Sequence, residues 1–312
     1  MKTAARIAVA AGLTGYILWR SHPARVAEVL AGTDWRPLAV AIALVAIDRA
    51  LMAYRWIVLL CIVPSHQRPP VLDLLRIFFV STFVGTFLPM SVGTDAVRAY
   101  STAQLNVRGA DAVASVFMDR MLGVASILLL AAAGLFVARD LASNGTILTA
   151  LALASAVCVV TLLMIFNARL AGAIGSVLRR FPATIARPAA KVMESIRRYA
   201  THHRQLGTVL GGSVGVQVLR IVQAYYLGLS LGIAAPVSIY FAFVPLILLI
   251  MLLPVSFNGI GVSQAAFWWF FGRAGVSEAQ AFALSVLFIS LGVVGNLPGA
   301  FLYAWRRRSP SR

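Results

Sequence analysis

The sequence is poor in acidic residues and in cysteine. Ten Asp and Glu residues stand against 27 Lys and Arg residues, so the formal net charge is +17. The two cysteines, Cys61 and Cys158, lie far apart in apolar surroundings and form no CxxC pair. They predict neither a disulfide framework nor a thiolate metal site, and they are typical of small buried apolar side chains.

Sequence signatures of catalysis are absent as well. The chain has no GxSxG, HExxH or GxxxxGK[ST] motif, and its four histidines form no metal-binding set. His202 and His203 are adjacent, but they lie in a basic stretch where solvated side chains are expected. We therefore predict no catalytic residue, no metal site and no cofactor.

Apolar residues dominate the composition. Hydrophobic residues make up 60% of the chain and charged residues 12%, and apolar runs recur along its whole length. This is typical of a polytopic, all-α integral membrane protein rather than a soluble core. Most basic residues lie in short loops between apolar runs, as the positive-inside rule explains, so we expect no nucleic-acid partner. The first run has no convincing cleavage site after it and is predicted to be a transmembrane helix.

The apolar runs predict a single membrane domain, residues 1–312, with about six full spans. The predicted spans are residues 4–19, 37–63, 111–138, 145–166, 206–232 and 279–303. Two further arms, residues 73–105 and 237–273, are too broken for full crossings and are predicted to be re-entrant helical hairpins. Residues 20–36 are expected to be an exposed link.

Residues 167–205 form a basic loop, which carries eight basic residues against one acid, Glu194. Pro188 could start a helix with Val192, Ile196, Tyr199 and His203 on one side. Such a helix would suit an anionic membrane surface. The alternative is a solvated loop that only fixes the topology.

The first broken arm contains VGTFLPMSVGTDAVRAY, residues 84–100. Pro89 removes a backbone donor and Gly93 permits a sharp turn. Such a break is tolerated in hydrocarbon only where protein or a water-filled cavity satisfies the backbone. Asp95 and Arg98 follow three residues apart and share one face of a helix that begins near Ser91. The stretch predicts a polar site inside a membrane.

The second broken arm contains LLPVSFNGIGVSQA, residues 252–265. Both arms share Leu-Pro-x-Ser followed by glycine: Leu88, Pro89, Ser91 and Gly93 in one, Leu253, Pro254, Ser256 and Gly259 in the other. Interrupted segments at matching places in two halves are typical of a transporter's binding site. The pattern favours an inverted repeat, although chance similarity is the alternative.

The distribution of Lys and Arg among the loops predicts that both termini lie in the cytoplasm. The first hairpin then enters from the cytoplasm and the second from outside, so their polar breaks meet near the midplane. The N-terminal ends of helices at that depth would present free N–H groups to an anion.

Ionisable residues within spans are the candidate substrate-binding residues, because a charge there costs at least ~2.5–3.5 kcal/mol. Asp95, Arg98, Asp119 and Arg120 are the strongest. Neighbouring residues on a helix point in different directions, so Asp119 is expected to pair with Arg98 rather than with Arg120. The alternative is a set of structural ion pairs that lock the hairpin to its neighbour.

Further candidates lie elsewhere in the spans and at the breaks. Arg49 adjoins Asp48, and Arg220 has glutamines nearby. The positions predicted at the two breaks are Ser91, Gly93, Asn258, Gly259 and Gln264. Arg55 and Arg76 are instead expected to extend to the membrane interface.

Three ordered stretches resemble a known family. They are FLPMSVGTDAVRAY, DRMLGVASILLL and LLPVSFNGIGVSQAAF. Together they resemble the membrane domain of lysylphosphatidylglycerol synthases and its stand-alone flippase-like relatives (UPF0104-type), over about residues 5–303. Two positions depart from the family pattern: Thr94 replaces the usual second glycine, and Gln264 replaces a usual glutamate. If that glutamate takes up protons in relatives, Gln264 cannot.

The resemblance implies translocation or binding of an anionic lipid, such as a modified phosphatidylglycerol or a polyprenyl-phosphate-linked lipid. Full synthases carry a soluble aminoacyltransferase domain, which this sequence lacks, so we do not expect an enzyme. One alternative is a non-transporting partner of a separate transferase or glycosyltransferase, and homo-oligomers are also possible. A weaker alternative is an enzyme that uses Asp95 or Asp119 on a lipid phosphate. The expected location is the cytoplasmic membrane.

Overall fold

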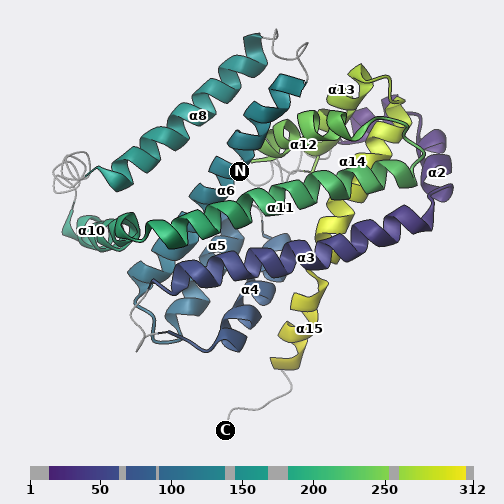
Figure 1. The fold of residues 1–312 in the computed structure, drawn as a ribbon. Coiled ribbons are helices and arrows are strands. Elements are labelled where there is room, and N and C mark those ends of the chain that lie inside the picture. Colours follow the sequence, from purple (N-terminus) through teal and green to yellow (C-terminus); the bar gives the residue numbers. More distant parts are fainter. Residues whose placement is uncertain are drawn as a thin grey trace.

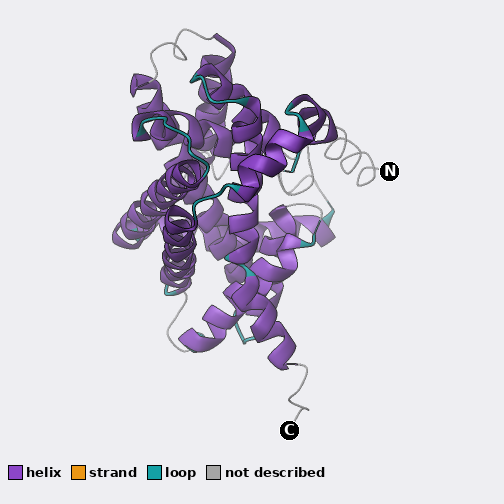
Figure 2. Cartoon of the chain, turned by 90° about the vertical axis from the view of Figure 1, so that its right-hand side faces the viewer, coloured by secondary structure: helices purple, strands orange, loops and turns teal. Residues whose placement is uncertain are grey.

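The computed structural model describes residues 14–62, 68–88, 91–137, 145–167, 182–252 and 260–306. These residues form helices joined by short connections and contain no strand, which confirms the predicted all-α class (Figure 1, Figure 2). In chain order the elements are α2 (Pro23–Ala31), α3 (Trp35–Leu60), α4 (Val71–Thr86), α5 (Ser91–Ala103), α6 (Gly109–Val137), α8 (Gly145–Phe166), α10 (Ala183–Arg198), the 3₁₀ turn η2 (Tyr199–Thr201), α11 (His203–Ser230), α12 (Val237–Met251), α13 (Val262–Arg273), α14 (Glu278–Val294) and α15 (Leu297–Arg306).

Four helical stretches within the described residues are long and apolar enough to cross a membrane. They are Trp35–Leu60, Gly109–Phe136, His203–Ser230 and Glu278–Ala304. Each coincides with a predicted span, and together they confirm a polytopic membrane protein. Most of the first predicted span, residues 4–19, lies outside the described residues.

The helices α3 and α11 lie side by side and run antiparallel (Figure 1). Their approach depends on two glycines of α11. A Cβ on Gly212 would lie 3.0 Å from the Arg55 Cγ, and one on Gly215 would lie 3.2 Å from the Leu51 Cδ2. Small residues at a helix contact allow the backbones of membrane helices to approach closely. The pair therefore forms a tight central crossing.

The first predicted arm is a pair of antiparallel helices. A Cβ on Gly85 of α4 would collide with the Thr94 hydroxyl of α5, and one on Gly93 would meet the Leu88 side chain at 2.6 Å. The Arg98 Nε approaches the Ser81 hydroxyl one turn further along. The chain thus folds back between Thr86 and Ser91, as the broken sequence predicts.

The second predicted arm also folds back on itself. Phe271, near the end of α13, packs against Tyr240 and Phe243 of α12, with ring centroids 5.0 and 5.6 Å apart. Its helices occupy Val237–Met251 and Val262–Arg273, which match the predicted arm. The intervening residues 253–259 lie outside the described part of the chain.

The two arms belong to two similar runs of elements. In each run a long helix precedes a helical hairpin and another long apolar stretch follows it: α3, α4–α5 and α6, then α11, α12–α13 and α14–α15. Each closing stretch packs on the first hairpin helix of the other run. Gly134 of α6 lies against the Phe241 carbonyl, and Gly299 of α15 lies against the Phe79 carbonyl. With α3 and α11 antiparallel, this is the arrangement expected of an inverted repeat.

Three details differ from the sequence prediction. The last span is divided, because α14 ends at Val294 and α15 begins at Leu297, with Pro298 in its first turn. The predicted link at residues 20–36 contains α2, whose Val26 packs against Phe282 of α14. The basic helix α10 begins at Ala183 rather than at Pro188, which lies inside it.

The basic helix keeps most of its predicted apolar side. Ile196 and Tyr199 are buried against the rest of the chain, and Val192 packs beside them. His203 is exposed at the start of α11. Residues 168–181 of the predicted loop lie outside the described part of the chain.

Candidate functional site

Side chains from both runs of helices surround a cavity of about 160 Å³, here called the central cavity. Its lining comprises Met52 and Arg55 of α3, Thr82 of α4, Thr94, Asp95 and Arg98 of α5, Asp119, Arg120, Gly123, Val124 and Ile127 of α6, Val216, Gln217 and Arg220 of α11, and Leu252 after α12. The start of α5 and the end of α12 therefore reach one space. The residues at the two breaks lie largely outside the described part of the chain, so their meeting near the midplane stays a prediction.

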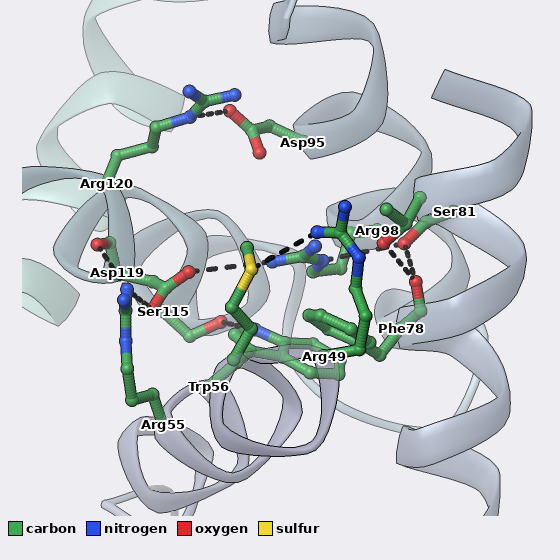
Figure 3. A network of polar contacts seen from close by, with 12 residues as sticks. Arg49, Arg55, Trp56, Phe78, Ser81, Asp95, Arg98, Ser115, Asp119 and Arg120 are labelled. Carbon is green, nitrogen blue, oxygen red and sulfur yellow. Dashed lines mark hydrogen bonds and ion pairs between the residues drawn. The ribbon is translucent and has the colours of Figure 1, made fainter. Parts of the chain in front are cut away.

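Asp119 is the shared counter-ion of two buried arginines. The Arg55 Nη2 donates to the Asp119 Oδ1 at 2.6 Å, and the Arg98 Nη1 lies 3.6 Å from the Asp119 Oδ2. Figure 3 shows the two guanidinium groups approaching Asp119 from different helices. The pairing of Asp119 with Arg98 was predicted, and that with Arg55 was not.

Arg55 had been expected to extend to the membrane interface, and that expectation is wrong. Its exposed fraction is 4%, and its guanidinium also donates to the Asp119 carbonyl oxygen. The sequence does contain a pattern from which the inward position of Arg55 could have been predicted. Asp48, Met52 and Arg55 are spaced along α3 so that they share one face, and that face turns toward α11 and α6.

Arg98 lies in an aromatic enclosure. Its guanidinium carbon is 5.3 Å from the Trp56 ring centroid and 4.7 Å from the Phe78 ring centroid (Figure 3). The whole residue is 4% exposed, and such desolvated contacts between a cation and an aromatic ring are favourable. The Trp56 Nε1 in turn donates to the Ser115 hydroxyl. Arg98 is therefore a fixed positive charge at the wall of the cavity.

Arg120 is oriented away from Asp119, toward α5. Its Nε donates to the Asp95 Oδ2 at 2.6 Å (Figure 3). The side chains of Arg120 and Asp95 are 38% and 19% exposed, so this pair is more accessible than the Asp119 pairs. Among the predicted residues, Arg120 is thus the cation best placed to exchange its partner for a ligand.

A second polar cluster lies where α3 crosses α11. The Asp48 Oδ2 is 3.6 Å from the Arg49 Nη1, and the Asp48 Oδ1 is 3.5 Å from the Arg220 Nε. Both guanidinium groups also donate to the Met52 sulfur at 3.4 Å. The structure therefore brings Arg49 and Arg220, predicted separately from two distant spans, around one carboxylate.

This cluster borders a second cavity of about 260 Å³, here called the side cavity. It is lined by Val45, Asp48, Arg49, Thr86, Arg220, Gln223, Leu248, Met251, Phe288, Ile289, Gly292, Val293 and Asn296. Arg220 lines both cavities. Asn296 lies at the unpredicted break between α14 and α15, and its Nδ2 donates to the Thr86 hydroxyl at 2.8 Å. Sequence reasoning missed Asn296 and Thr86 because that break was not foreseen.

The two linings carry an excess of positive charge. Five arginines and three aspartates line the two cavities, which leaves two positive charges in excess. The arginines are Arg49, Arg55, Arg98, Arg120 and Arg220, and the aspartates are Asp48, Asp95 and Asp119. Isolated charges are costly inside a membrane. The arrangement therefore suits an anionic ligand.

The remaining predicted residues are divided between three places. Gly93 lies at the close approach of α5 to Leu88. Ser91 begins α5, but its side chain lies outside the described part, as do Asn258 and Gly259. The Gln264 Oε1 accepts from the Gly261 N–H at 2.6 Å and from the Ser263 hydroxyl at 2.9 Å, and Gln264 lines neither cavity.

Gln264 therefore caps the start of its own helix. A side-chain acceptor at this place satisfies N–H groups that lack a partner within the helix. A substrate-binding role for Gln264 stays a prediction. Among the described residues, no group of three His, Cys, Asp or Glu side chains could hold a metal ion.

A comparison with family models gives one match. The model for the lysylphosphatidylglycerol synthase TM region matches residues 3–299. No curated protein and no solved structure matches the chain. Since the matched region covers nearly all of the sequence, the chain belongs to the family of the lysylphosphatidylglycerol synthase TM region.

Proposed function

We propose that this protein binds the phosphate-bearing head of an anionic lipid in the central cavity and carries it across the cytoplasmic membrane. The observation that carries the proposal is the excess of two positive charges around cavities enclosed by membrane-spanning helices. A lipid phosphodiester would balance part of this charge. The family of the TM region, which is linked by name to lipid modification, supports the same class of ligand.

In this proposal, Arg98 and Arg120 have different roles in binding the phosphate. Arg98 is held by Asp119, Trp56 and Phe78, and supplies a fixed positive charge. Arg120 is more exposed and exchanges Asp95 for the lipid phosphate. Arginine binds phosphate well because its planar fork donates two parallel hydrogen bonds.

Apolar groups complete the central cavity. Val124, Ile127 and Leu252 line it beside the charged groups. A ligand with a charged head and an apolar body matches this mixture better than a free ion does. This favours a lipid over a soluble anion.

In this proposal, the two hairpins provide alternate access by opening the cavity toward one side of the membrane or the other. The start of α5 and the end of α12 border the same cavity, and the inverted orientation of the two runs would let each hairpin open toward one side. We further propose that both termini lie in the cytoplasm. Translocation then requires no bond to be made or broken, and the chain acts as a transporter rather than as an enzyme.

The test uses the full chain in vesicles that contain phosphatidylglycerol labelled on an acyl chain. Dithionite added outside bleaches only the outer leaflet, so flipping appears as bleaching beyond about half of the label. Arg120→Gln should abolish the additional bleaching. Arg273→Gln is the matched control, since Arg273 packs on Trp269 and lines neither cavity.

Lipid that binds but is never flipped by the wild-type chain would support the alternative of a non-transporting partner, which presents lipid to a separate transferase. Co-purification of such an enzyme would strengthen that alternative. Equal flipping by Arg120→Gln and wild type would contradict the assignment of the site.

A further inference from the structure

The side cavity contains polar atoms that no other group satisfies. The Gln223 Nε2 and the Asn296 Oδ1 are buried and have no hydrogen-bond partner, and both residues line this cavity. Gln223 as a whole is only 4% exposed. Buried polar groups are nearly always paired. The Asp48 Oδ1 and the Arg49 Nε also lack a hydrogen-bond partner, but they belong to the ion-paired cluster. Outside that cluster, one amide donor and one amide acceptor are therefore available to a ligand.

The two amides come from different helices. Gln223 belongs to α11, and Asn296 lies at the break between α14 and α15. The other amide atom of Asn296 is held by the Thr86 hydroxyl, which fixes the direction of the group. A donor and an acceptor at separate, fixed places suit hydroxyl groups, because a hydroxyl both donates and accepts.

The charges around the side cavity do not suit a cation. Asp48 is its one lining carboxylate among the described residues, and it already faces Arg49 and Arg220. The lining therefore carries one net positive charge. An ammonium group would meet two guanidinium groups, whereas an uncharged polar group would meet no such repulsion.

The side cavity adjoins the proposed phosphate site. Arg220 lines both cavities, and it shares the Met52 sulfur with Arg49. Because Arg220 separates the two spaces, a phosphate bound in the central cavity would place the next part of its head group toward the side cavity. We propose that the side cavity binds the uncharged, hydroxyl-bearing part of a lipid head whose phosphate occupies the central cavity, an inference that rests on the proposed function.

The experiment is a competition among lipids with matched acyl chains. The purified full-length chain in detergent is incubated with equal amounts of phosphatidylglycerol, phosphatidylinositol, phosphatidic acid and lysylphosphatidylglycerol. Native mass spectrometry then measures the lipids retained. Phosphatidylglycerol and phosphatidylinositol should be retained in preference to lysylphosphatidylglycerol, whose head carries an ammonium group.

The variants are Gln223→Met and Asn296→Leu, which keep approximate volume and remove the amides. Each should lower the ratio of retained phosphatidylglycerol to phosphatidic acid by about fivefold to tenfold, as the loss of one buried hydrogen bond implies. Retention of phosphatidic acid should not change. Gln205→Met, on α11 but lining neither cavity, is the control. The melting temperature of each variant shows whether it is folded, and either folded variant alone is sufficient to test the inference.

Two results would overturn the inference while leaving the proposed function in place. One is an unchanged ratio in a folded variant, and the other is preferential retention of lysylphosphatidylglycerol. Failure of the proposed function would look different, because wild type and Arg120→Gln would then retain anionic lipids equally. Displacement of phosphatidylglycerol by excess sn-glycerol 3-phosphate would assign the cavities to a soluble phosphate ester and overturn both proposals.

Discussion

The Asp119 carboxylate of α6 lies between Arg55 of α3 and Arg98 of α5, at 2.6 and 3.6 Å from their guanidinium groups. All three residues are at most 8% exposed. One acidic side chain therefore ties the first hairpin to two long helices, and it offsets two buried positive charges. We therefore expect the removal of Asp119 to lower the stability of the fold.

Asp119→Leu should destabilise the fold by about 3–5 kcal/mol, because it leaves two buried guanidinium groups without their carboxylate. Thermal unfolding in detergent measures this. The double variant Asp119→Leu with Arg55→Met should recover part of the loss, since one unpaired charge is gone. Equal stability of Asp119→Leu and wild type would show that Asp119 and its two arginines are not desolvated.

Asp95→Asn should separate binding from transport. The change removes the carboxylate that competes for Arg120, so anionic lipid should bind severalfold more tightly and be released more slowly. Lipid retention and the dithionite assay measure the two effects on one preparation. Weaker binding by this variant would indicate that Asp95 positions Arg120 instead of competing with the ligand.

Gly134→Ala tests the contact between α6 and α12. A Cβ at this position would lie 2.8 Å from the Phe241 carbonyl oxygen, so the backbones of α6 and α12 would have to separate. The expected destabilisation is about 1–3 kcal/mol. Gly207→Ala is the matched control on α11, where a Cβ would meet nothing within 4 Å. It should be neutral or slightly stabilising, because alanine favours a helix.

Tyr199 should make stability depend on pH in the alkaline range. Burial raises the pKa of Tyr199, and the nearby Asp111 carboxylate raises it further. The Tyr199 hydroxyl donates to the Leu59 carbonyl oxygen at 3.2 Å. Because the unfolded chain loses this proton at a pH of about 10, the stability contributed by the neutral phenol is present below that pH and is lost above it.

The melting temperature of wild type should therefore fall more steeply above pH 10 than that of Tyr199→Phe. Below pH 9, Tyr199→Phe should be the less stable protein, since it lacks the hydrogen bond to Leu59. Parallel curves over the whole range would contradict the assignment of the pH effect to Tyr199.

Much of the fold follows from hydrophobic runs and helix breakers. The long apolar runs placed four of the predicted spans, residues 37–63, 111–138, 206–232 and 279–303, on helices long enough to cross a membrane, because membrane crossing depends on local composition. The Pro89 and Pro254 signals placed the two helical hairpins α4–α5 and α12–α13. The division at Gly295 was missed, since the apolar run continues across it. The Gly295 position also packs closely against Arg49 and Val45, a contact that only the folded chain shows.

The candidate site was only partly predictable. Charges within spans mark candidates, which is how Asp119 and Arg98 were recognised as partners. The place of Arg55 depends on the rotation of α3 against α11, which Gly212 and Gly215 set through close packing. The unpaired Gln223 Nε2 and Asn296 Oδ1 could not be foreseen, because a missing partner is a property of the assembled cavity.

The position of Arg220 at the crossing of α3 and α11 links the two cavities through one side chain. Its guanidinium group contacts Asp48 and the Met52 sulfur while it lines both spaces. Rotation about its own bonds would change the shape and charge of both compartments together. Communication between them thus requires a rotamer change of one side chain, not the displacement of a helix.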